Sequence, residues 1–289
     1  MPLRGGVARR AGVVSGKEND MKKTIIIAVA VLLLGTLVMV YAGVRLLETN
    51  KVYQEADAVY EVLSKQVRKN ATAEPAPLPA QELAAMDSPS AQESEHEARI
   101  PVYIPDVEID FDLLRGINGD SAAWLYSPGT VIDYPVMKAE DYYYYLNHLS
   151  DGTVNANGSL FIDYNNAPDF SDDLTVIYGH HMKSGRMFGG LVGYKEQRFY
   201  EEHPFMYLYT ETQNYRIDLM YGSVIGAWEW RDNAFMYEEN IEDLISYAKN
   251  NTTFTSDVDY QAGDRLVVLS TCSYEYYDAR YFVVGRLTN

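Results

Sequence analysis

Arg265-Leu-Val-Val-Leu-Ser-Thr-Cys272 is an apolar run that ends in the only cysteine of the chain. A second run, Tyr281-Phe-Val-Val284, begins just after Arg280, which lies eight residues beyond the cysteine. Runs of β-branched and aromatic residues indicate strands, so the thiol and the guanidinium lie near strand ends. A third run, Thr175-Val-Ile-Tyr178, leads through a glycine into His180. Cysteine, histidine and arginine at strand ends form a candidate catalytic set.

A lone cysteine also has a less specific interpretation. Cysteine is among the most buried residue types, so a single one at a strand end is usually core filler. The neighbouring His180 and Arg280 reverse this balance in favour of a nucleophile. Because the chain has no second cysteine, the thiol is free unless it pairs with another chain.

Composition excludes several classes of protein. The 289 residues are 47% apolar and include 25 tyrosines, which favours a packed, strand-rich fold over disorder. The net charge of −17 is unevenly spread: residues 1–23 hold six Lys and Arg against two Asp and Glu, whereas the part after residue 44 holds 18 against 39. Such an acidic surface repels phosphate backbones and argues against nucleic-acid binding.

Residues 24–44 contain 21 residues without a charge, which roughly matches a hydrocarbon core of ~30 Å. Lysine and arginine precede this segment, so the positive-inside rule places the N-terminus in the cytoplasm and the acidic part outside. A cleaved signal peptide is the alternative, but its apolar region is shorter, ~7–15 residues. We therefore expect an uncleaved anchor that contacts membrane lipid. Met21 is a second candidate start, and the sequence does not choose between the two.

The segment after the anchor predicts a helix followed by a spacer. Between residues 46 and 70, apolar positions recur at spacings of three and four, which indicates an amphipathic helix; these positions are Tyr53, Ala56, Tyr60, Leu63 and Val67. Residues 71–97 are rich in Pro, Ala, Ser and Glu and predict a flexible spacer. The expected organisation is a cytoplasmic tail (1–23), a transmembrane anchor (24–44), an extracellular helix and spacer (45–99) and a catalytic domain (100–289).

The remaining chain predicts a mainly β fold, a closed or nearly closed barrel with helical decorations. Parallel βαβ architecture would need more crossover helices than the sequence offers. Strands are expected at 122–126, 131–137, 159–163, 174–178, 215–225, 265–271 and 281–287. Helices are expected at 112–116, 187–194 and 240–250, the last capped by Asn240.

These motifs resemble the sortase family. Leu269-Ser-Thr-Cys272 with Arg280 is similar to the strand end that carries its cysteine, and Tyr178-Gly-His-His-Met182 is similar to its histidine loop. The class B subgroup fits further segments in the same order, namely Ala123-Trp-Leu125, Pro128-Gly-Thr-Val-Ile-Asp-Tyr-Pro-Val136, Tyr144-Tyr-Leu-Asn-His148 and Gly158-Ser-Leu-Phe-Ile-Asp-Tyr164. The likeness covers roughly residues 112–287.

The resemblance implies a sortase-type barrel and a membrane-anchored cysteine transpeptidase at the Gram-positive cell surface. Such enzymes cleave a C-terminal sorting motif of a secreted protein after threonine. They hold the acyl group on cysteine and transfer it to an amine of the peptidoglycan precursor or of a pilin. No metal or organic cofactor is implied. Housekeeping anchoring and pilus assembly, the sorting motif and the oligomeric state stay open, as do a cysteine hydrolase and a silent peptide-binding module.

The chemistry assigns a role to each residue. Only a thiolate attacks, and an ordinary thiol has a pKa of ~8.5, so Cys272 as nucleophile requires a cationic neighbour. Arg280 would stabilise the oxyanion or position the substrate. His180 would act as general acid and then general base.

Two rivals exist for these roles. His181 faces the opposite side of an extended segment, and the family pattern selects His180, the histidine directly after Tyr-Gly. Arg286 lies six residues beyond Arg280, or about 20 Å along a strand, too far for the same site. Ser270, Thr271 and Tyr178 are expected to line the substrate groove.

Overall fold

The computed structural model describes residues 8–69, 104–105 and 107–289. The chain forms two compact units, residues 1–52 and residues 53–289. The expected spacer at residues 71–97 lies outside the described residues.

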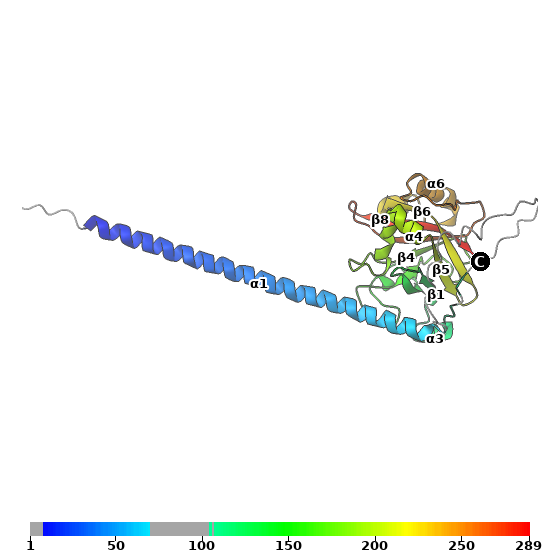
Figure 1. The fold of residues 1–289 in the computed structure, drawn as a ribbon, viewed down its shortest axis with the longest axis horizontal. Helices are drawn as coiled ribbons and strands as arrows, with labels where there is room; N and C mark the ends of the chain where they lie inside the picture. Colours follow the sequence, from blue (N-terminus) through cyan, green and yellow to red (C-terminus); the bar gives the residue numbers. More distant parts are fainter. Residues whose placement is uncertain (1–7, 70–103, 106) are drawn as a thin grey trace, which may run out of the picture. The chain divides into compact units, whose positions relative to one another are not determined.

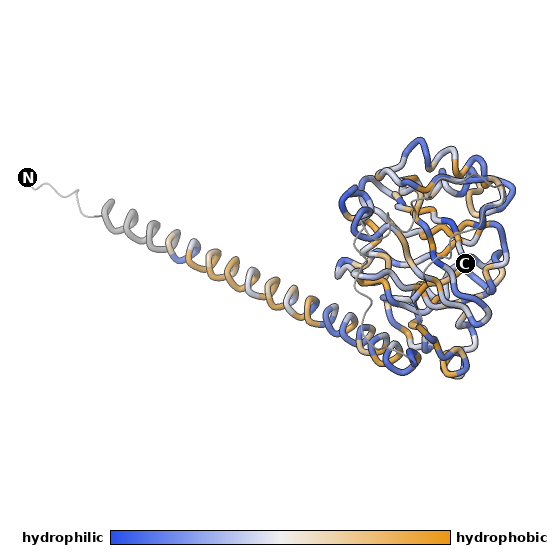
Figure 2. The backbone as a smooth tube through the Cα atoms, turned by 45° about the vertical axis from the view of Figure 1, so that its right-hand side comes forward, coloured by the Kyte–Doolittle hydropathy of each residue, from blue (hydrophilic) through white to orange (hydrophobic). Residues whose placement is uncertain are grey.

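Within the described residues, the first unit is the N-terminal part of helix α1 (Ala8–Val67), up to residue 52. It is the one helix of the described chain that is long and apolar enough to cross a membrane, judged by length and composition. All side chains from residue 21 to residue 51 are exposed, and Figure 2 shows a run of hydrophobic residues along this helix. Exposed apolar surface of this extent is typical of a segment that inserts into lipid.

The second unit contains a closed barrel of eight strands, as the sequence predicts (Figure 1). Its strand order is β1-β2-β3-β4-β7-β8-β6-β5, and β5 pairs with β1 to close the ring. Two neighbouring pairs, β2 with β3 and β4 with β7, are parallel. The strands are β1 (Ser121–Tyr126), β2 (Asp133–Lys138), β3 (Leu160–Ile162), β4 (Leu174–Tyr178), β5 (Phe205–Thr210), β6 (Asn214–Gly226), β7 (Leu266–Cys272) and β8 (Ala279–Thr288).

Short helices decorate the barrel. They are α3 (Phe111–Ile117), η1 (Tyr144–Leu146), η2 (Phe188–Lys195), α4 (Gln197–Glu202), α5 (Ala227–Asp232), η3 (Glu238–Asn240) and α6 (Ile241–Asn250), where η denotes a 3-10 helix. Helices α5 and α6 belong to the long segment between β6 and β7. The sequence analysis expected α6 there but did not predict α5.

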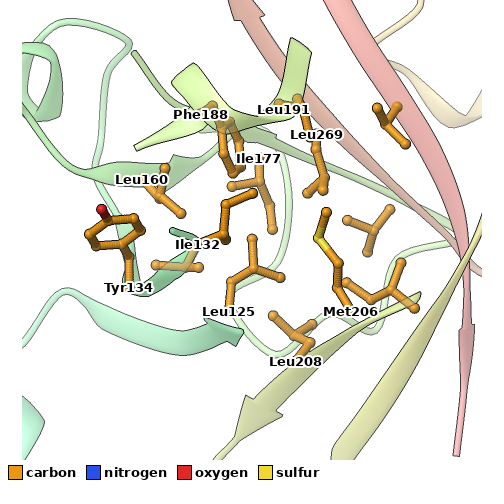
Figure 3. Close-up of a cluster of buried hydrophobic side chains, with 14 of the residues drawn as sticks. Leu125, Ile132, Tyr134, Leu160, Ile177, Phe188, Leu191, Met206, Leu208 and Leu269 are labelled. Carbon is orange, nitrogen blue, oxygen red and sulfur yellow. The ribbon is translucent and has the colours of Figure 1, made fainter. Parts of the chain in front are cut away.

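The main core fills the interior of the barrel. Strand residues with alternating positions point inward, and loop residues close the ends. Figure 3 shows ten of these side chains converging: Leu125, Ile132, Tyr134, Leu160, Ile177, Phe188, Leu191, Met206, Leu208 and Leu269. Burial of each large aliphatic or aromatic side chain contributes about 1.5–3 kcal/mol, so this cluster is a major source of the barrel's stability.

The C-terminal part of α1, residues 53–67, belongs to the second unit and packs against the barrel. Ala56, Tyr60, Leu63 and Val67 are buried and belong to its core clusters. Arg68 forms an ion pair with the Asp133 side chain at the end of this helix. The predicted amphipathic helix is therefore confirmed, and its apolar face is part of the barrel's own core.

Three details differ from the prediction. Strand β5 was not predicted, and the expected helix at residues 187–194 is the 3-10 helix η2. Gly189 lets this helix lie close to the Met182 backbone, against which an added side chain would press. Asn240 stands at the N-cap position of α6, but its side chain donates to the Ala234 carbonyl and caps nothing.

Candidate active site

Four side chains share the outer face of three adjacent strands. Tyr178 on β4 pairs with Ser270 on β7, and Cys272 on β7 pairs with Arg280 on β8. Side chains of paired residues point to the same side of a sheet, as do residues two apart on one strand. Because Ser270 and Cys272 are two apart, all four residues lie on one face; we call them the open end.

The same face is covered farther along the strands. Six apolar side chains there are fully buried beneath residues of α5 and α6, in a cluster with Trp230, Leu244 and Ile245. We call these six residues the covered end; they are Leu174, Val176, Leu266, Val268, Phe282 and Val284.

Cys272 is exposed and forms no disulfide. Its thiol has no hydrogen-bond partner among the residues that the structure describes. Directly across the strand pair stands Arg280, at a register where Cβ atoms are about 4.5–5.5 Å apart. The half-buried Arg280 guanidinium makes no hydrogen bond or ion pair with the described residues. Cys272, with its exposed thiol, and Arg280, with a permanently charged guanidinium whose N–H donors are unused by the described residues, are thus direct neighbours across the strand pair.

Both histidines directly follow Gly179 at the end of β4, but they make different contacts. The Nε2 atom of His180 donates to the Leu146 carbonyl at 2.8 Å. The Nδ1 atom of His181 donates to the Cys272 backbone carbonyl at 2.8 Å, and its ring lies 4.8 Å from that of Tyr274. A carbonyl only accepts, so a neutral His180 keeps Nδ1 as an acceptor and a neutral His181 keeps Nε2.

Thr271 corrects an expectation from the sequence. It is 1% exposed, and its hydroxyl donates to the Gly179 carbonyl at 2.8 Å. Alternation along β7 turns its side chain away from the face of Cys272. Thr271 therefore holds β7 against the turn that precedes His180 and does not line a groove at the open end.

Ser270 and Tyr178 do belong to the open end. Ser270 is 1% exposed, and its hydroxyl has no hydrogen-bond partner in the described structure. Tyr178 is half-buried and donates to the Asp163 carboxylate at 3.0 Å. Burial, together with the nearby carboxylate of Asp163, raises the pKa of Tyr178 well above its ordinary value. The tyrosine is therefore a neutral donor throughout the physiological range.

Asp163 is a residue of this region that the sequence analysis did not single out. Its carboxylate is fully buried and accepts hydrogen bonds from the hydroxyls of Tyr142, at 2.8 Å, and Tyr178. The only sequence signal was an aspartate at the end of the strand predicted over residues 159–163. Its role in joining two tyrosines depends on the fold.

The segment that follows Cys272 is held by Lys195. The Lys195 ammonium donates to the Ser273 hydroxyl at 2.8 Å and forms an ion pair with Glu275. Ser273 is buried, so the position after Cys272 contacts this network and not the open end. Arg286, the rival guanidinium, interacts with Asp218 and Asp264 at 3.8 Å each.

The arrangement supports acyl transfer through sulfur. An exposed thiol, a guanidinium opposite it, the His181 imidazole on the cysteine's own carbonyl and the neighbouring His180 supply a nucleophile, an oxyanion donor and candidate proton-transfer groups. In the described part of the chain, no group of three or more His, Cys, Asp or Glu side chains could hold a metal ion.

Comparisons with known proteins agree with this chemistry. The family model of the sortase domain matches residues 125–288. Sortase B of Listeria monocytogenes is 33% identical over 178 residues, which cover 60% of this chain and 72% of that protein.

Solved structures give the same result. The X-ray structure of Clostridium perfringens sortase B is 27% identical, with a TM-score of 0.58, and the match covers 62% of this chain and all of that one (100%). A Streptococcus pyogenes class B sortase involved in pilus biogenesis is 31% identical, with a TM-score of 0.55, and the match covers 62% of this chain and 97% of that one.

Proposed function

This chain belongs to the sortase family of cysteine transpeptidases, and we propose that it cleaves a C-terminal sorting motif after threonine and transfers the protein to an amine of the peptidoglycan precursor. The observation that carries the proposal is the direct cross-strand pairing of the exposed Cys272 with Arg280. A peptide-binding module would have no chemical need for this pair.

The reaction has two steps. The Cys272 thiolate attacks the threonine carbonyl, a C–S bond forms, and the C–N bond to the next residue breaks as the leaving amine takes a proton. The acceptor amine then attacks the thioester and gives up a proton, a C–N bond forms, and the C–S bond breaks as the Cys272 thiolate leaves. Arg280 donates hydrogen bonds to the oxyanion in both tetrahedral intermediates.

His180 is our candidate for the proton transfers. Its Nε2 atom is held by the Leu146 carbonyl at 2.8 Å, which fixes the ring and leaves Nδ1 to exchange the proton. It protonates the leaving amine in the first step and deprotonates the acceptor amine in the second. His181 is the rival, since it contacts the backbone of Cys272.

Two residues are proposed to contact the peptide. Ser270 lies on the face of Cys272, two residues before it on β7, and its hydroxyl has no partner among the described residues; a contact with the peptide would require local movement, because this side chain is 1% exposed. Tyr178 flanks it on the neighbouring strand.

The apolar part of α1 is proposed to be an uncleaved membrane anchor, with the N-terminus in the cytoplasm and the barrel outside. The basic residues ahead of residue 24 and the acidic composition beyond residue 44 support this orientation. A signal sequence passes the same test of length and composition.

A pilin-polymerising sortase is the second candidate. It is favoured by the 31% identity to the Streptococcus pyogenes enzyme, which is involved in pilus biogenesis. The catalytic chemistry would be identical, and only the acceptor amine would differ.

Intact-mass spectrometry of the full chain in detergent tests the proposal. The chain is incubated with sorting-motif peptides of the Asn-Pro-Gln-Thr and Ser-Pro-x-Thr-Gly types, with and without triglycine, a diaminopimelate-containing stem peptide or a lysine-bearing pilin. An adduct on Cys272 that an amine converts into a ligated product supports transpeptidation, and the preferred amine distinguishes wall from pilus. Hydrolysis at the same rate with every amine would overturn it.

A further inference from the structure

The C-terminal part of helix α1 contacts the barrel through a buried tyrosine, Tyr60. Tyr60 is 5% exposed, and its hydroxyl donates to the Gly158 carbonyl at 2.7 Å. The same hydroxyl lies 2.9 Å from the Ser159 Oγ atom. Burial raises the pKa of Tyr60 above its ordinary value, so the phenol keeps its proton.

Gly158 and Ser159, the two partners of Tyr60, contact the surroundings of His180, the candidate catalytic histidine. The Ser159 amide donates to the Tyr145 carbonyl at 2.9 Å, and the next carbonyl, of Leu146, accepts from His180. Gly158 has a φ of +60° and lies so close that an added Cβ would collide with the Tyr145 carbonyl and stand 3.1 Å from the His180 ring. The segment from Gly158 to Ser159 is therefore packed against both His180 and the backbone that holds its Nε2 atom.

The helix also contacts the other segment that flanks His180. Asp57, three residues before Tyr60, forms an ion pair with Arg186 at 3.1 Å. The Tyr60 ring packs edge to face on Tyr134 at 5.2 Å, and the Tyr134 hydroxyl accepts from the Met187 amide at 3.4 Å.

The segment 186–188 also contacts the backbone of His180. The amide of Phe188, the residue after Met187, donates to the His180 carbonyl at 3.0 Å. One turn of α1 thus supports His180 from the ring side, through residues 145–159, and from the backbone side, through residues 186–188.

We propose that Tyr60 is a positioning residue for His180, so that the juxtamembrane helix is part of the catalytic apparatus. This inference rests on the proposed function, in which His180 transfers the protons. General acid–base catalysis requires the imidazole within hydrogen-bond reach of the reacting atoms, and small misplacements are costly. Loss of the Tyr60 hydroxyl removes a buried hydrogen bond on the segment that supports the ring, and it leaves the helix in place.

The test compares Tyr60→Phe with Tyr53→Phe in the full chain in detergent. Tyr53 is a half-buried tyrosine on the same helix that also packs against the barrel core. We expect Tyr60→Phe to lower kcat about ten-fold with KM changed less than two-fold and the midpoint of thermal unfolding changed by a few degrees. Tyr53→Phe should leave kcat unchanged.

A substrate-free measurement separates positioning from mere stability. The rate at which iodoacetamide alkylates Cys272, the only cysteine, is followed against pH in the unsubstituted chain, in Tyr60→Phe and in His180→Ala. Because His180 is the proposed proton-transfer partner of Cys272, we expect the Tyr60→Phe profile to move from the unsubstituted profile toward that of His180→Ala.

The outcomes distinguish the two proposals. Unchanged kcat and an unchanged alkylation profile in Tyr60→Phe would overturn the positioning role, and so would a loss of activity that only follows the folded fraction. If the unsubstituted chain ligates no peptide, the proposed function fails, and the alkylation profiles alone still decide whether Tyr60 acts on His180.

Discussion

The open end and the covered end lie on the same face of the same three strands, yet their side chains differ in polarity and in what covers them. At the covered end, α5 and α6 bury six apolar side chains. At the open end, an exposed cysteine faces an arginine that is half-buried and without a hydrogen bond to the described residues. Strand alternation selects the face, and what covers each end decides whether its residues stabilise the fold or react.

The sharpest test of this contrast exchanges a residue at each end. Cys272→Ala should lower turnover by about 10⁴-fold or more, because the nucleophile is lost, and should leave the free energy of unfolding nearly unchanged. Leu266→Ala, on the same strand, should lower the free energy of unfolding by about 2–5 kcal/mol and leave kcat of the folded fraction intact. Intact-mass assays and denaturant titrations measure the two quantities, and similar effects of both variants on stability would break the comparison.

The next effect concerns the two histidines. His180→Ala should lower kcat by about 10²–10⁴-fold, as expected for loss of a general acid and base. His181→Ala removes one hydrogen bond to the Cys272 carbonyl, worth about 1 kcal/mol or roughly five-fold. Steady-state kinetics with a peptide and an amine acceptor give both numbers. The reverse order of effects would transfer the catalytic role to His181.

A smaller effect separates two arginines on the same face of β8. Arg280→Ala should lower kcat/KM by about 10²–10³-fold, the usual cost of losing an oxyanion donor. Arg286 interacts with Asp218 and Asp264, and Arg286→Ala should lower the free energy of unfolding by about 1 kcal/mol without a change in kcat/KM. A rate defect in Arg286→Ala would show that the reactive region extends farther along the strand than we describe.

The smallest effect appears at alkaline pH. Tyr178 has a raised pKa because it is buried and lies beside Asp163. A group whose pKa is raised in the folded state contributes stability that is present below its unfolded pKa, about 10, and is lost as the pH rises above that value. Tyr178→Phe should therefore lower the free energy of unfolding by about 1 kcal/mol at pH 8. Between pH 10 and 12, the free energy of unfolding should fall less in this variant than in the unsubstituted chain. Parallel pH curves for the two proteins would contradict this.

Regular patterning made much of the fold predictable. The bounds of β4 match the prediction, and the three-four spacing of Tyr60, Leu63 and Val67 correctly identified the buried face of α1. Strand β5, like β4, is buried on both faces: Met206 points into the barrel, and Tyr207 packs outside it. It escaped because it lacks a β-branched run such as Thr175-Val-Ile177, which marked β4. A strand buried on both sides shows no alternation of apolar and polar residues. The six-residue helices α4 and α5 are too short to display a helical period.

The candidate site was predictable only in part. Cysteine, histidine and arginine were visible as motifs, and the register of β7 with β8 brings Cys272 and Arg280 together. The inward orientation of Thr271 and the joining of two tyrosines by Asp163 depend on contacts between distant segments. No local pattern contains that information.

The closed ring of strands has a consequence for how a peptide is recognised. Each of the eight strands has a hydrogen-bonded neighbour on both sides, so no strand is an edge strand along its whole length, although the part of β6 beyond Leu219 pairs with β8 alone. We therefore expect a substrate on the outer surface to be read by side chains more than by added backbone pairing. Its sequence preference is then encoded by single exposed positions that substitution can change one at a time, and the same closure protects the barrel from edge-to-edge aggregation.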